Sequence, residues 1–452
     1  MNKYDVVVIG SGPGGFTAAV RAAQIGAKVA IIEKSFIGGT CLNCGCIPTK
    51  FLWKALKIKQ EIQRSYEYGF SAILDPVIFE NIINKKNKNI SIIRKGMESI
   101  LSSYNIVFFY GVASFKDKNT LLILNSENGK TEIYADKIII ASGTEPSTVG
   151  NFVFDGVRVI NSTDALNLKK IPKNMLIVGG GAIGIEMATI FSGFGCQITL
   201  VERANSLLSS EDHEVSEEIS KNLSRHGVKI ITSCTNAIYD IDRYEKILVV
   251  TGRSPSSIFL NLENAGINTV RGNGFIETNE FCQTKINNIY SVGDIAGKNL
   301  LAYTAQNEGV AAAENAINGN NISVNNCAVP QVVFSMPPSA SVKILNFIES
   351  KNIIFGKFPF TANGRALIEN ERMGFVKCAV DVLTRKPLAF WIVGAHSDEV
   401  VNAAAQILKS GMKCLSRETI FHPSFSESLL NAYEDAFGKC TEAVKKNKAK
   451  KI

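Results

Sequence analysis

The stretch DVVVIGSGPGGFTAAVRAAQIGAKVAIIEK, residues 5–34, has the pattern of a buried strand, a glycine-rich turn, a helix and a second buried strand. Gly10, Gly12 and Gly15 fit the spacing Gly-x-Gly-x-x-Gly, which lets the backbone turn sharply and approach a pyrophosphate at the helix N-terminus. Glu33 ends the second strand, where a carboxylate can accept hydrogen bonds from a ribose. Together these features predict a dinucleotide-binding βαβ unit.

The same pattern recurs in NMLIVGGGAIGIEMATIFSGFGCQITLVER, residues 174–203. Gly179, Gly181 and Gly184 provide the turn, and Glu202 ends the following strand. One chain therefore holds two predicted dinucleotide-binding units. Two such units close together indicate electron transfer between a flavin and a nicotinamide.

The acidic residue of the second unit predicts the nicotinamide coenzyme. A carboxylate at this position hydrogen-bonds a free ribose hydroxyl and repels a 2′-phosphate, so Glu202 favours NAD over NADP. Arg203 follows directly and weakens this prediction slightly, although we interpret it as a surface residue.

Length and composition set the broad class. A chain of 452 residues suggests about three domains, and 46% hydrophobic with 20% charged residues is typical of a globular protein. The net charge of +8 comes without a basic stripe interleaved with aromatic residues, so we expect no nucleic-acid partner. The apolar runs are too short to cross a bilayer, and because a strand is predicted at the very start, we expect no leader sequence. Because most cysteines are dispersed, we expect a reducing compartment and a cytoplasmic location.

The stretch GGTCLNCGCIPTK, residues 38–50, places Cys41, Cys44 and Cys46 within six positions. A zinc site would need a second cysteine pair or histidines, and the first histidine is His213, so we expect no metal. A purely structural disulfide would be unusual in a reducing compartment. A reactive dithiol is the favoured interpretation, because the first turn of the helix that follows would lower a thiol pKa.

This cysteine stretch resembles the redox-active segment of the pyridine nucleotide-disulfide oxidoreductases. The resemblance covers almost the whole chain and includes, in order, ADKIIIASGTEP, GGGAIGIE, LVVTGRSP, IYSVGDIAG, LLAYTAQNEGVAAAENA, GKFPFTANGRAL, VGAHSDEV and HPSFSE. Each motif alone is moderately specific, and the ordered set is very specific.

The resemblance implies roles for the residues around the dithiol. Cys41 would be the interchange thiol that meets substrate, and Cys46 would be the charge-transfer thiol that faces the flavin. Lys50 would lie beside the flavin with Glu186 as its ion-pair partner. Cys44 is a departure from the family, and we interpret it as a packed neutral thiol.

A second catalytic element is implied near the end of the chain. His422 corresponds to the family's acid/base, and Glu427 corresponds to the carboxylate that orients it. Ser424 replaces the family's threonine, which is a mild change. In the family this region forms the dimer interface, so His422 would serve the disulfide of the other subunit.

The implied fold is α/β, with two Rossmann-like dinucleotide-binding domains for FAD and NAD and a C-terminal α+β dimerisation domain. We expect the FAD domain in residues 1–145 and 275–325, a shortened NAD domain in 146–274 and the dimerisation domain in 326–452. The expected cofactor contacts are Gly10, Gly12, Gly14, Gly15, Glu33, Lys50, Gly143, Asp294 and Ala302 for FAD, and Gly179, Gly181, Gly184, Glu186, Glu202 and Gly252 for the NAD side.

The best match within the family is the branch that oxidises dihydrolipoyl groups and passes electrons through the dithiol and FAD to NAD⁺. The expected partners are a second copy of the chain and the lipoyl domains of 2-oxoacid dehydrogenase acyltransferase subunits, or the lipoyl carrier protein of a glycine cleavage complex. Two alternatives remain. One is a glutathione-reductase-like enzyme, which Glu202 and the lack of an arginine cluster disfavour. The other is a non-catalytic assembly paralogue, which the segment 234–247, shorter than the family's β-meander, would motivate.

Overall fold

The computed structural model describes residues 2–125, 129–234, 241–270, 273–324, 327–412 and 416–443. The chain forms two compact units. Unit 1 comprises Met1–Lys170 and Leu248–Asn325, and unit 2 comprises Ile171–Ile247 and Asn326–Ile452. The predicted boundaries of the three domains, after residues 145, 274 and 325, stay a prediction.

Unit 1 is built on a seven-stranded sheet in the order β3-β2-β1-β6-β5-β4, with β14 also pairing with β6. The pairs β1–β2, β2–β3, β1–β6 and β6–β14 are parallel, and the pairs β4–β5 and β5–β6 are antiparallel. Runs of valine and isoleucine suit parallel strands that are covered on both faces. The strands are β1 (Asn2–Ile9), β2 (Val29–Glu33), β3 (Val107–Tyr110), β4 (Val112–Phe115), β5 (Thr120–Leu124), β6 (Lys130–Ile140) and β14 (Ile289–Ser291).

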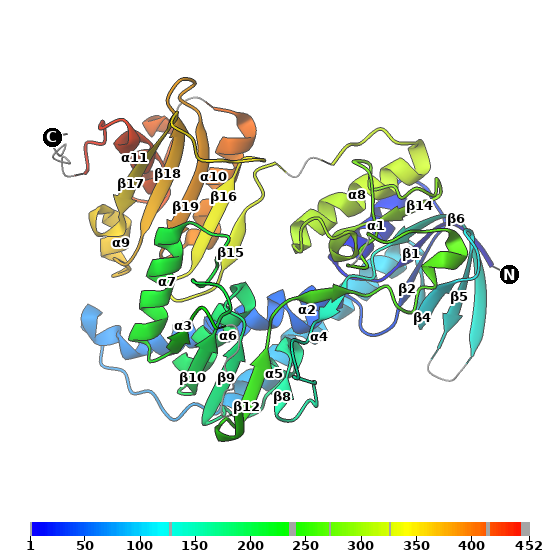
Figure 1. Cartoon of the computed structure of the whole chain (residues 1–452), viewed down its shortest axis with the longest axis horizontal. Coiled ribbons are helices and arrows are strands. Elements are labelled where there is room, and N and C mark those ends of the chain that lie inside the picture. Colours follow the sequence, from blue (N-terminus) through cyan, green and yellow to red (C-terminus); the bar gives the residue numbers. More distant parts are fainter. Residues whose placement is uncertain are drawn as a thin grey trace. The chain divides into compact units, whose positions relative to one another are not determined.

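Helices α1 (Pro13–Gln24) and α8 (Ala302–Asn318) lie side by side against this sheet (Figure 1). Small residues allow the close approach, because a Cβ atom on Gly309 would lie 2.3 Å from the Gly14 carbonyl oxygen. Proline at the first position of α1 suits the start of a helix, where its missing N–H costs no hydrogen bond. The glycine-rich turn is thereby fixed at the carboxyl end of β1.

The cysteine segment and a long helix complete the part of unit 1 that concerns the dithiol. The elements are α2 (Gly39–Cys44), α3 (Cys46–Gln63) and α4 (Phe79–Ser103). The smaller elements are η1 (Ser65–Tyr68), β7 (Thr144–Pro146), β8 (Val159–Ile160), α5 (Ser162–Ala165), β13 (Arg253–Pro255), η3 (Leu262–Ala265) and η4 (Gly293–Ala296), with β12 (Lys246–Val249) at the boundary of the two units.

The first part of unit 2 repeats the nucleotide-binding arrangement. Strand β10 (Gln197–Val201) pairs in parallel with β9 (Asn174–Val178) and β11 (Lys229–Ile231), and the helices are α6 (Ala182–Gly193) and α7 (His213–Arg225). The predicted short connection after β11 falls partly on residues 235–240, which lie outside the described residues. The described part of this connection holds the short helix η2 (Ile241–Arg243) and no strand.

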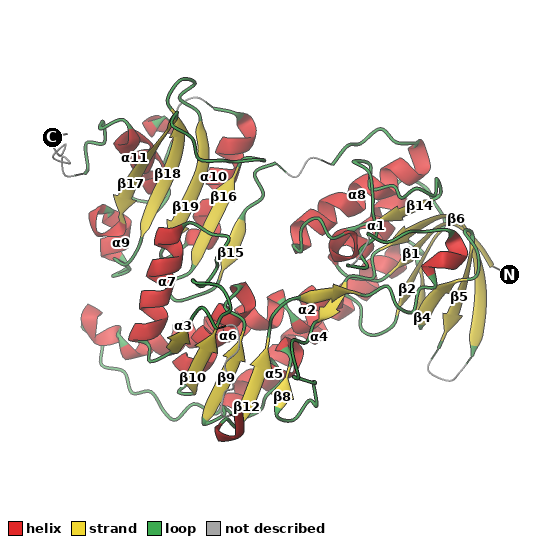
Figure 2. Cartoon of the chain, viewed as in Figure 1, coloured by secondary structure: helices red, strands yellow, loops and turns green. Residues whose placement is uncertain are grey.

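The second part of unit 2 is an antiparallel sheet in the order β15-β16-β19-β18-β17 (Figure 2). Helices α10 (Ser397–Ser410) and α11 (Glu427–Ala436) pack their apolar residues into the core against it. Lys377 of this sheet forms ion pairs of 2.8 Å with both Asp212 and Glu214 at the start of α7, which ties the two parts of unit 2 together. The remaining elements are β15 (Gln331–Val333), β16 (Ser339–Lys343), β17 (Ile353–Pro359), η5 (Phe360–Ala362), α9 (Gly364–Ile368), β18 (Phe375–Asp381), β19 (Pro387–Val393) and η6 (Arg417–Thr419).

Candidate functional site

The two expected redox cysteines lie on separate helices. Cys41 is in the first turn of α2, and Cys46 is the first residue of α3. The sequence predicted a helix after the cysteines and no separate helix α2. Gly45 has φ −140° and ψ −108°, which are not helical angles, and so divides the segment. Cys46 consequently lies at the N-terminus of the long helix α3, which stabilises negative charge on its thiol.

The Cys41 and Cys46 side chains are in contact. The hydrogen bond to Cys46 raises the pKa of Cys41, burial and the negative charge at Cys46 raise it further, and the Lys50 ammonium lowers it. The contact with Cys46 and burial thus both favour the protonated form of Cys41. The assignment of Cys41 as the interchange thiol and of Cys46 as the charge-transfer thiol stays a prediction.

Tyr303 lies near Cys46. Burial and then the charge at Cys46 raise the pKa of Tyr303 to about 12, so its hydroxyl keeps its proton in the working pH range. Tyr303 is the second residue of α8, directly after Ala302, which is an expected FAD contact. The start of α8 therefore faces the dithiol.

Asp294, the expected ribityl ligand, belongs to a three-residue chain of hydrogen bonds. Thr144 Oγ1 donates to Asp294 Oδ2 at 3.0 Å, and Arg253 donates through Nε to Thr144 Oγ1 at 2.7 Å. Burial raises the pKa of Asp294, while Thr144 and the Arg253 charge lower it. Sequence reasoning missed Thr144 and Arg253, although each directly follows an expected glycine, Gly143 or Gly252.

The first glycine-rich turn is held by Glu33. Glu33 Oε2 accepts from the Ser11 N–H at 2.9 Å and from Ser11 Oγ at 2.7 Å, and Oε1 accepts from Ser35 N–H at 2.9 Å. A carboxylate oxygen has more than one acceptor position, so these bonds still allow a ribose contact. Glu33 thus orients the turn, and its contact with FAD stays a prediction.

The second unit repeats this geometry at Glu202. Glu202 Oε2 accepts from Gly180 N–H at 2.6 Å, and Oε1 accepts from Ala204 N–H at 2.7 Å. The carboxylate is therefore fixed at the end of β10, where a nicotinamide nucleotide would present its adenosine ribose. Gly180 was not among the expected contacts, although it lies between Gly179 and Gly181.

The two turns suit pyrophosphate groups. A Cβ atom on Gly15 would lie 1.9 Å from the Gly10 carbonyl oxygen, whereas no described atom lies within 4 Å of a Cβ placed on Gly181. No described side chain caps the N-terminus of α1 or of α6, so their first N–H groups can bind a ligand. Gly184 is buried inside α6, where it serves packing. The residues present therefore fit FAD in unit 1 and NAD in unit 2.

The expected Lys50–Glu186 pair involves both units. Lys50 lies one turn after Cys46 on α3, and its charge acts on Cys41. Glu186 is buried on α6, where Oε1 accepts from Phe334 N–H at 3.1 Å. Because the two residues belong to different units, the pair stays a prediction.

His422 and Glu427 form the second element of the expected chemistry. His422 Nδ1 lies 2.7 Å from Glu427 Oε1, and Glu427 Oε2 accepts from Ser424 N–H at 2.8 Å. The hydrogen bond to Glu427 and then its charge raise the pKa of His422. The ring is 77% exposed, so Nε2 can exchange a proton with a substrate.

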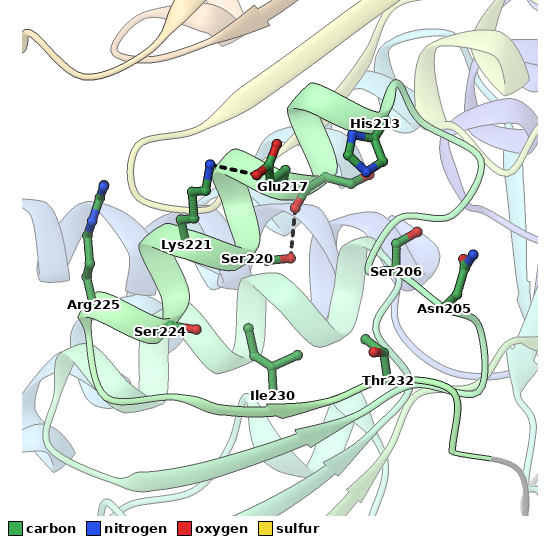
Figure 3. Close-up of a pocket in the computed structure, with 11 residues that line it drawn as sticks. Asn205, Ser206, His213, Glu217, Ser220, Lys221, Ser224, Arg225, Ile230 and Thr232 are labelled. Carbon is green, nitrogen blue, oxygen red and sulfur yellow. Dashed lines mark hydrogen bonds and ion pairs between the residues drawn. The ribbon is translucent and has the colours of Figure 1, made fainter.

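Unit 2 also has an open hollow of about 720 Å³ between α7, β11 and the turn after Glu202 (Figure 3). Most of the residues around it carry polar or charged side chains, and Lys221 pairs with Glu217 at 2.7 Å. The lining residues are Asn205, Ser206, His213, Ser216, Glu217, Ser220, Lys221, Ser224, Arg225, Ile230 and Thr232.

Comparison with known proteins gives the family. The model of the pyridine nucleotide-disulphide oxidoreductases matches residues 4–309, and the model of their dimerisation domain matches residues 329–433. The dihydrolipoyl dehydrogenase of Geobacillus stearothermophilus is 34% identical over 96% of this chain and 97% of its own length. A dihydrolipoyl dehydrogenase of Bacillus subtilis (strain 168) is 33% identical over 97% of this chain and 98% of its own length.

A solved structure has a similar fold along almost the entire chain. The Cu(II) complex of the HOCl-induced flavoprotein disulfide reductase RclA from Escherichia coli superposes with a TM-score of 0.86 and 29% identity, covering 96% of this chain and 99% of RclA. The cofactors of the family are FAD and NAD(H), and the dimerisation domain supports a homodimer. None of the described helices is long and apolar enough to cross a membrane. With its dithiol, two nucleotide-binding units and dimerisation domain, the chain belongs to the pyridine nucleotide-disulphide oxidoreductase family and is an oxidoreductase.

Proposed function

We propose that the protein is a dihydrolipoyl dehydrogenase that oxidises dihydrolipoyl groups and reduces NAD⁺. The observation that carries this proposal is the contact between Cys41 and Cys46 at the N-terminus of α3. The curated relatives with this name, at 33–34% identity over nearly the full chain, support the choice of substrate.

The proposed reaction begins with the pair oxidised to a disulfide. His422 takes a proton from one substrate thiol, and the resulting thiolate attacks the Cys41 sulfur, so Cys46 leaves as a thiolate. The second substrate thiol, once deprotonated, attacks the sulfur that is bound to Cys41. The substrate leaves as a cyclic disulfide, and the two electrons remain on Cys41 and Cys46 as a reduced dithiol.

FAD, when bound, supplies the path by which these two electrons reach NAD⁺ as hydride. The residues that would hold it are Gly10, Gly12, Glu33 and Asp294, and the Arg253–Thr144 pair fixes Asp294. Lys50 would add positive charge beside the dithiol. On the nicotinamide side, the fixed carboxylate of Glu202 would accept from the ribose hydroxyls and repel a 2′-phosphate.

The proposed substrates are lipoyl groups carried by other proteins. The candidates are the lipoyl domains of 2-oxoacid dehydrogenase acyltransferase subunits and the lipoyl carrier protein of a glycine cleavage complex. The relatives named dihydrolipoyl dehydrogenase support this substrate class.

The second candidate function is reduction of a disulfide substrate, which the similarity to the disulfide reductase RclA favours. The test is a comparison of two assays on the purified holoenzyme. We expect dihydrolipoamide to reduce NAD⁺ much faster than NADP⁺, and glutathione disulfide to oxidise NADPH poorly. Faster turnover of glutathione disulfide with NADPH would contradict the proposal and favour the reductase.

A further inference from the structure

Asn43 lies between the two redox cysteines and fastens the turn that precedes them. Its Nδ2 donates to the carbonyl oxygens of Gly39 at 2.8 Å and Ile37 at 3.0 Å. Helix α2 is only six residues long, and no described side chain caps its N-terminus. A helix this short is unstable by itself, so contacts from elsewhere must hold it in place.

Arg94 on α4 provides such a contact. Arg94 Nε donates to Asn43 Oδ1 at 2.6 Å, which is a charge-assisted hydrogen bond, and the guanidinium carbon lies 3.9 Å from the centre of the Phe36 ring. One side chain thus binds the turn before α2 and the residue between the cysteines. Helix α4 is itself held in place by packing, because its 25 residues include buried Ile83, Ile90 and Leu101.

The largest effects of charged groups on the pKa of Cys41 come from Cys46, Lys50 and Asp294. Arg94 acts instead on the amide of Asn43, and so on the backbone that carries Cys41. Thiol–disulfide exchange needs an in-line approach of three sulfur atoms, so a small displacement of Cys41 lowers the exchange rate.

We propose that Arg94 is a positioning residue for the Cys41–Cys46 pair. It fixes the turn through Asn43 and Phe36, so that Cys41 is presented for exchange and Cys46 is kept in place. The inference deepens the proposed function and rests on the dithiol being its redox centre. It predicts that Arg94 matters for the dithiol half of the reaction and not for electron transfer from NADH to other acceptors.

The test compares Arg94→Met with Lys95→Met in the holoenzyme. Lys95 is the neighbouring, exposed residue of α4, so both variants lose one positive charge from the same helix. We expect Arg94→Met to lower dihydrolipoamide-dependent kcat by about tenfold, on the scale of misplaced reacting groups. NADH oxidation by a quinone acceptor should stay unchanged, as should both activities of Lys95→Met. Arg94→Lys should recover part of the loss, because its ammonium can still donate to Asn43.

A spectroscopic readout separates this inference from the proposed function. Reduction of the wild type by NADH should give a long-wavelength absorption band from the Cys46 thiolate, whatever the physiological substrate is. Arg94→Met should weaken that band. Adding Asn43→Ala to Arg94→Met should weaken the band little further. Equal bands and equal rates in Arg94→Met and Lys95→Met would overturn the inference. Loss of quinone reduction or of bound FAD in Arg94→Met would also overturn it, since the role would then be general folding. A wild type with the band but without lipoyl activity would contradict only the proposed function.

Discussion

Glu427 orients His422 and raises its pKa. Its two oxygens bind the His422 ring and the Ser424 N–H, so the ring is both oriented and electrostatically stabilised in its protonated form. The sequence predicted this pair from its motif, and the geometry adds the backbone contact. The role of Glu427 therefore has a consequence for the pH dependence of the reaction.

We expect Glu427→Gln to move the acid limb of dihydrolipoamide oxidation to lower pH. His422 must be neutral to take the substrate proton, so activity rises as the pH passes its pKa. The hydrogen bond and charge of Glu427 raise that pKa, and removing the charge must lower it. The measurement is kcat/KM against pH, with the exposed Glu418→Gln as a control for general charge. An unshifted limb in Glu427→Gln would show that His422 is not the titrating base.

At the level of elements, the sequence predicted the strands, the glycine turns and the helices that follow them. Those features depend on local spacing, as in Gly10–Gly15 before α1. The division of the cysteine segment at Gly45 was not predicted. A glycine near a helix can lie inside it or mark its end, so the residue type alone does not decide between the two. Contacts from distant elements were also missed. Arg94 reaches Asn43 across 51 positions, and Arg253 reaches Thr144 across 109, so no local pattern reveals either.

Helix α4 contains a second long-range cation, Lys86. Its side chain is 1% exposed, and Nζ donates to the Leu166 carbonyl at 2.5 Å and to Asn167 Oδ1 at 2.9 Å. Burial lowers the pKa of Lys86 from 10.5 to about 8. Because the unfolded chain then binds more protons between these two values, this lysine makes the free energy of unfolding rise with pH in that window.

We expect Lys86→Met to remove that contribution. From pH 8 to pH 10.5, the free energy of unfolding of the wild type should rise by about 3 kcal/mol relative to that of Lys86→Met. The figure follows because one pKa unit corresponds to about 1.4 kcal/mol. Urea unfolding at several pH values measures it, with the exposed Lys85→Met as the matched control. A constant difference across that window would mean that Lys86 titrates normally in the folded protein.

At the scale of the whole molecule, the proposed chemistry divides between the two units. The dithiol belongs to unit 1, and the His422–Glu427 pair belongs to unit 2. The match to a dimerisation domain in residues 329–433 includes His422 and supports a homodimer. We propose that the dimer completes the active site by bringing His422 of one subunit to the Cys41–Cys46 pair of the other.

Subunit mixing tests this arrangement. We expect His422→Gln to lower lipoyl-dependent turnover by about a hundredfold or more, on the scale of a positioned acid/base, and Cys41→Ser to abolish it. After subunit exchange between the two inactive proteins, part of the activity should return, because each mixed dimer has one site with both residues intact. Proven exchange without recovered activity would place His422 with the dithiol of its own chain, or with neither.

The most direct test of the central claim is an anaerobic titration of the holoenzyme with dihydrolipoamide, followed by addition of NAD⁺. The account predicts that one equivalent of dihydrolipoamide produces the long-wavelength band of the Cys46 thiolate and that NAD⁺ then removes the band as NADH forms. Cys44→Ser should behave like the wild type, and Cys46→Ser should give no band. Failure of dihydrolipoamide to produce the band, or an equal loss of the band in Cys44→Ser, would contradict the account.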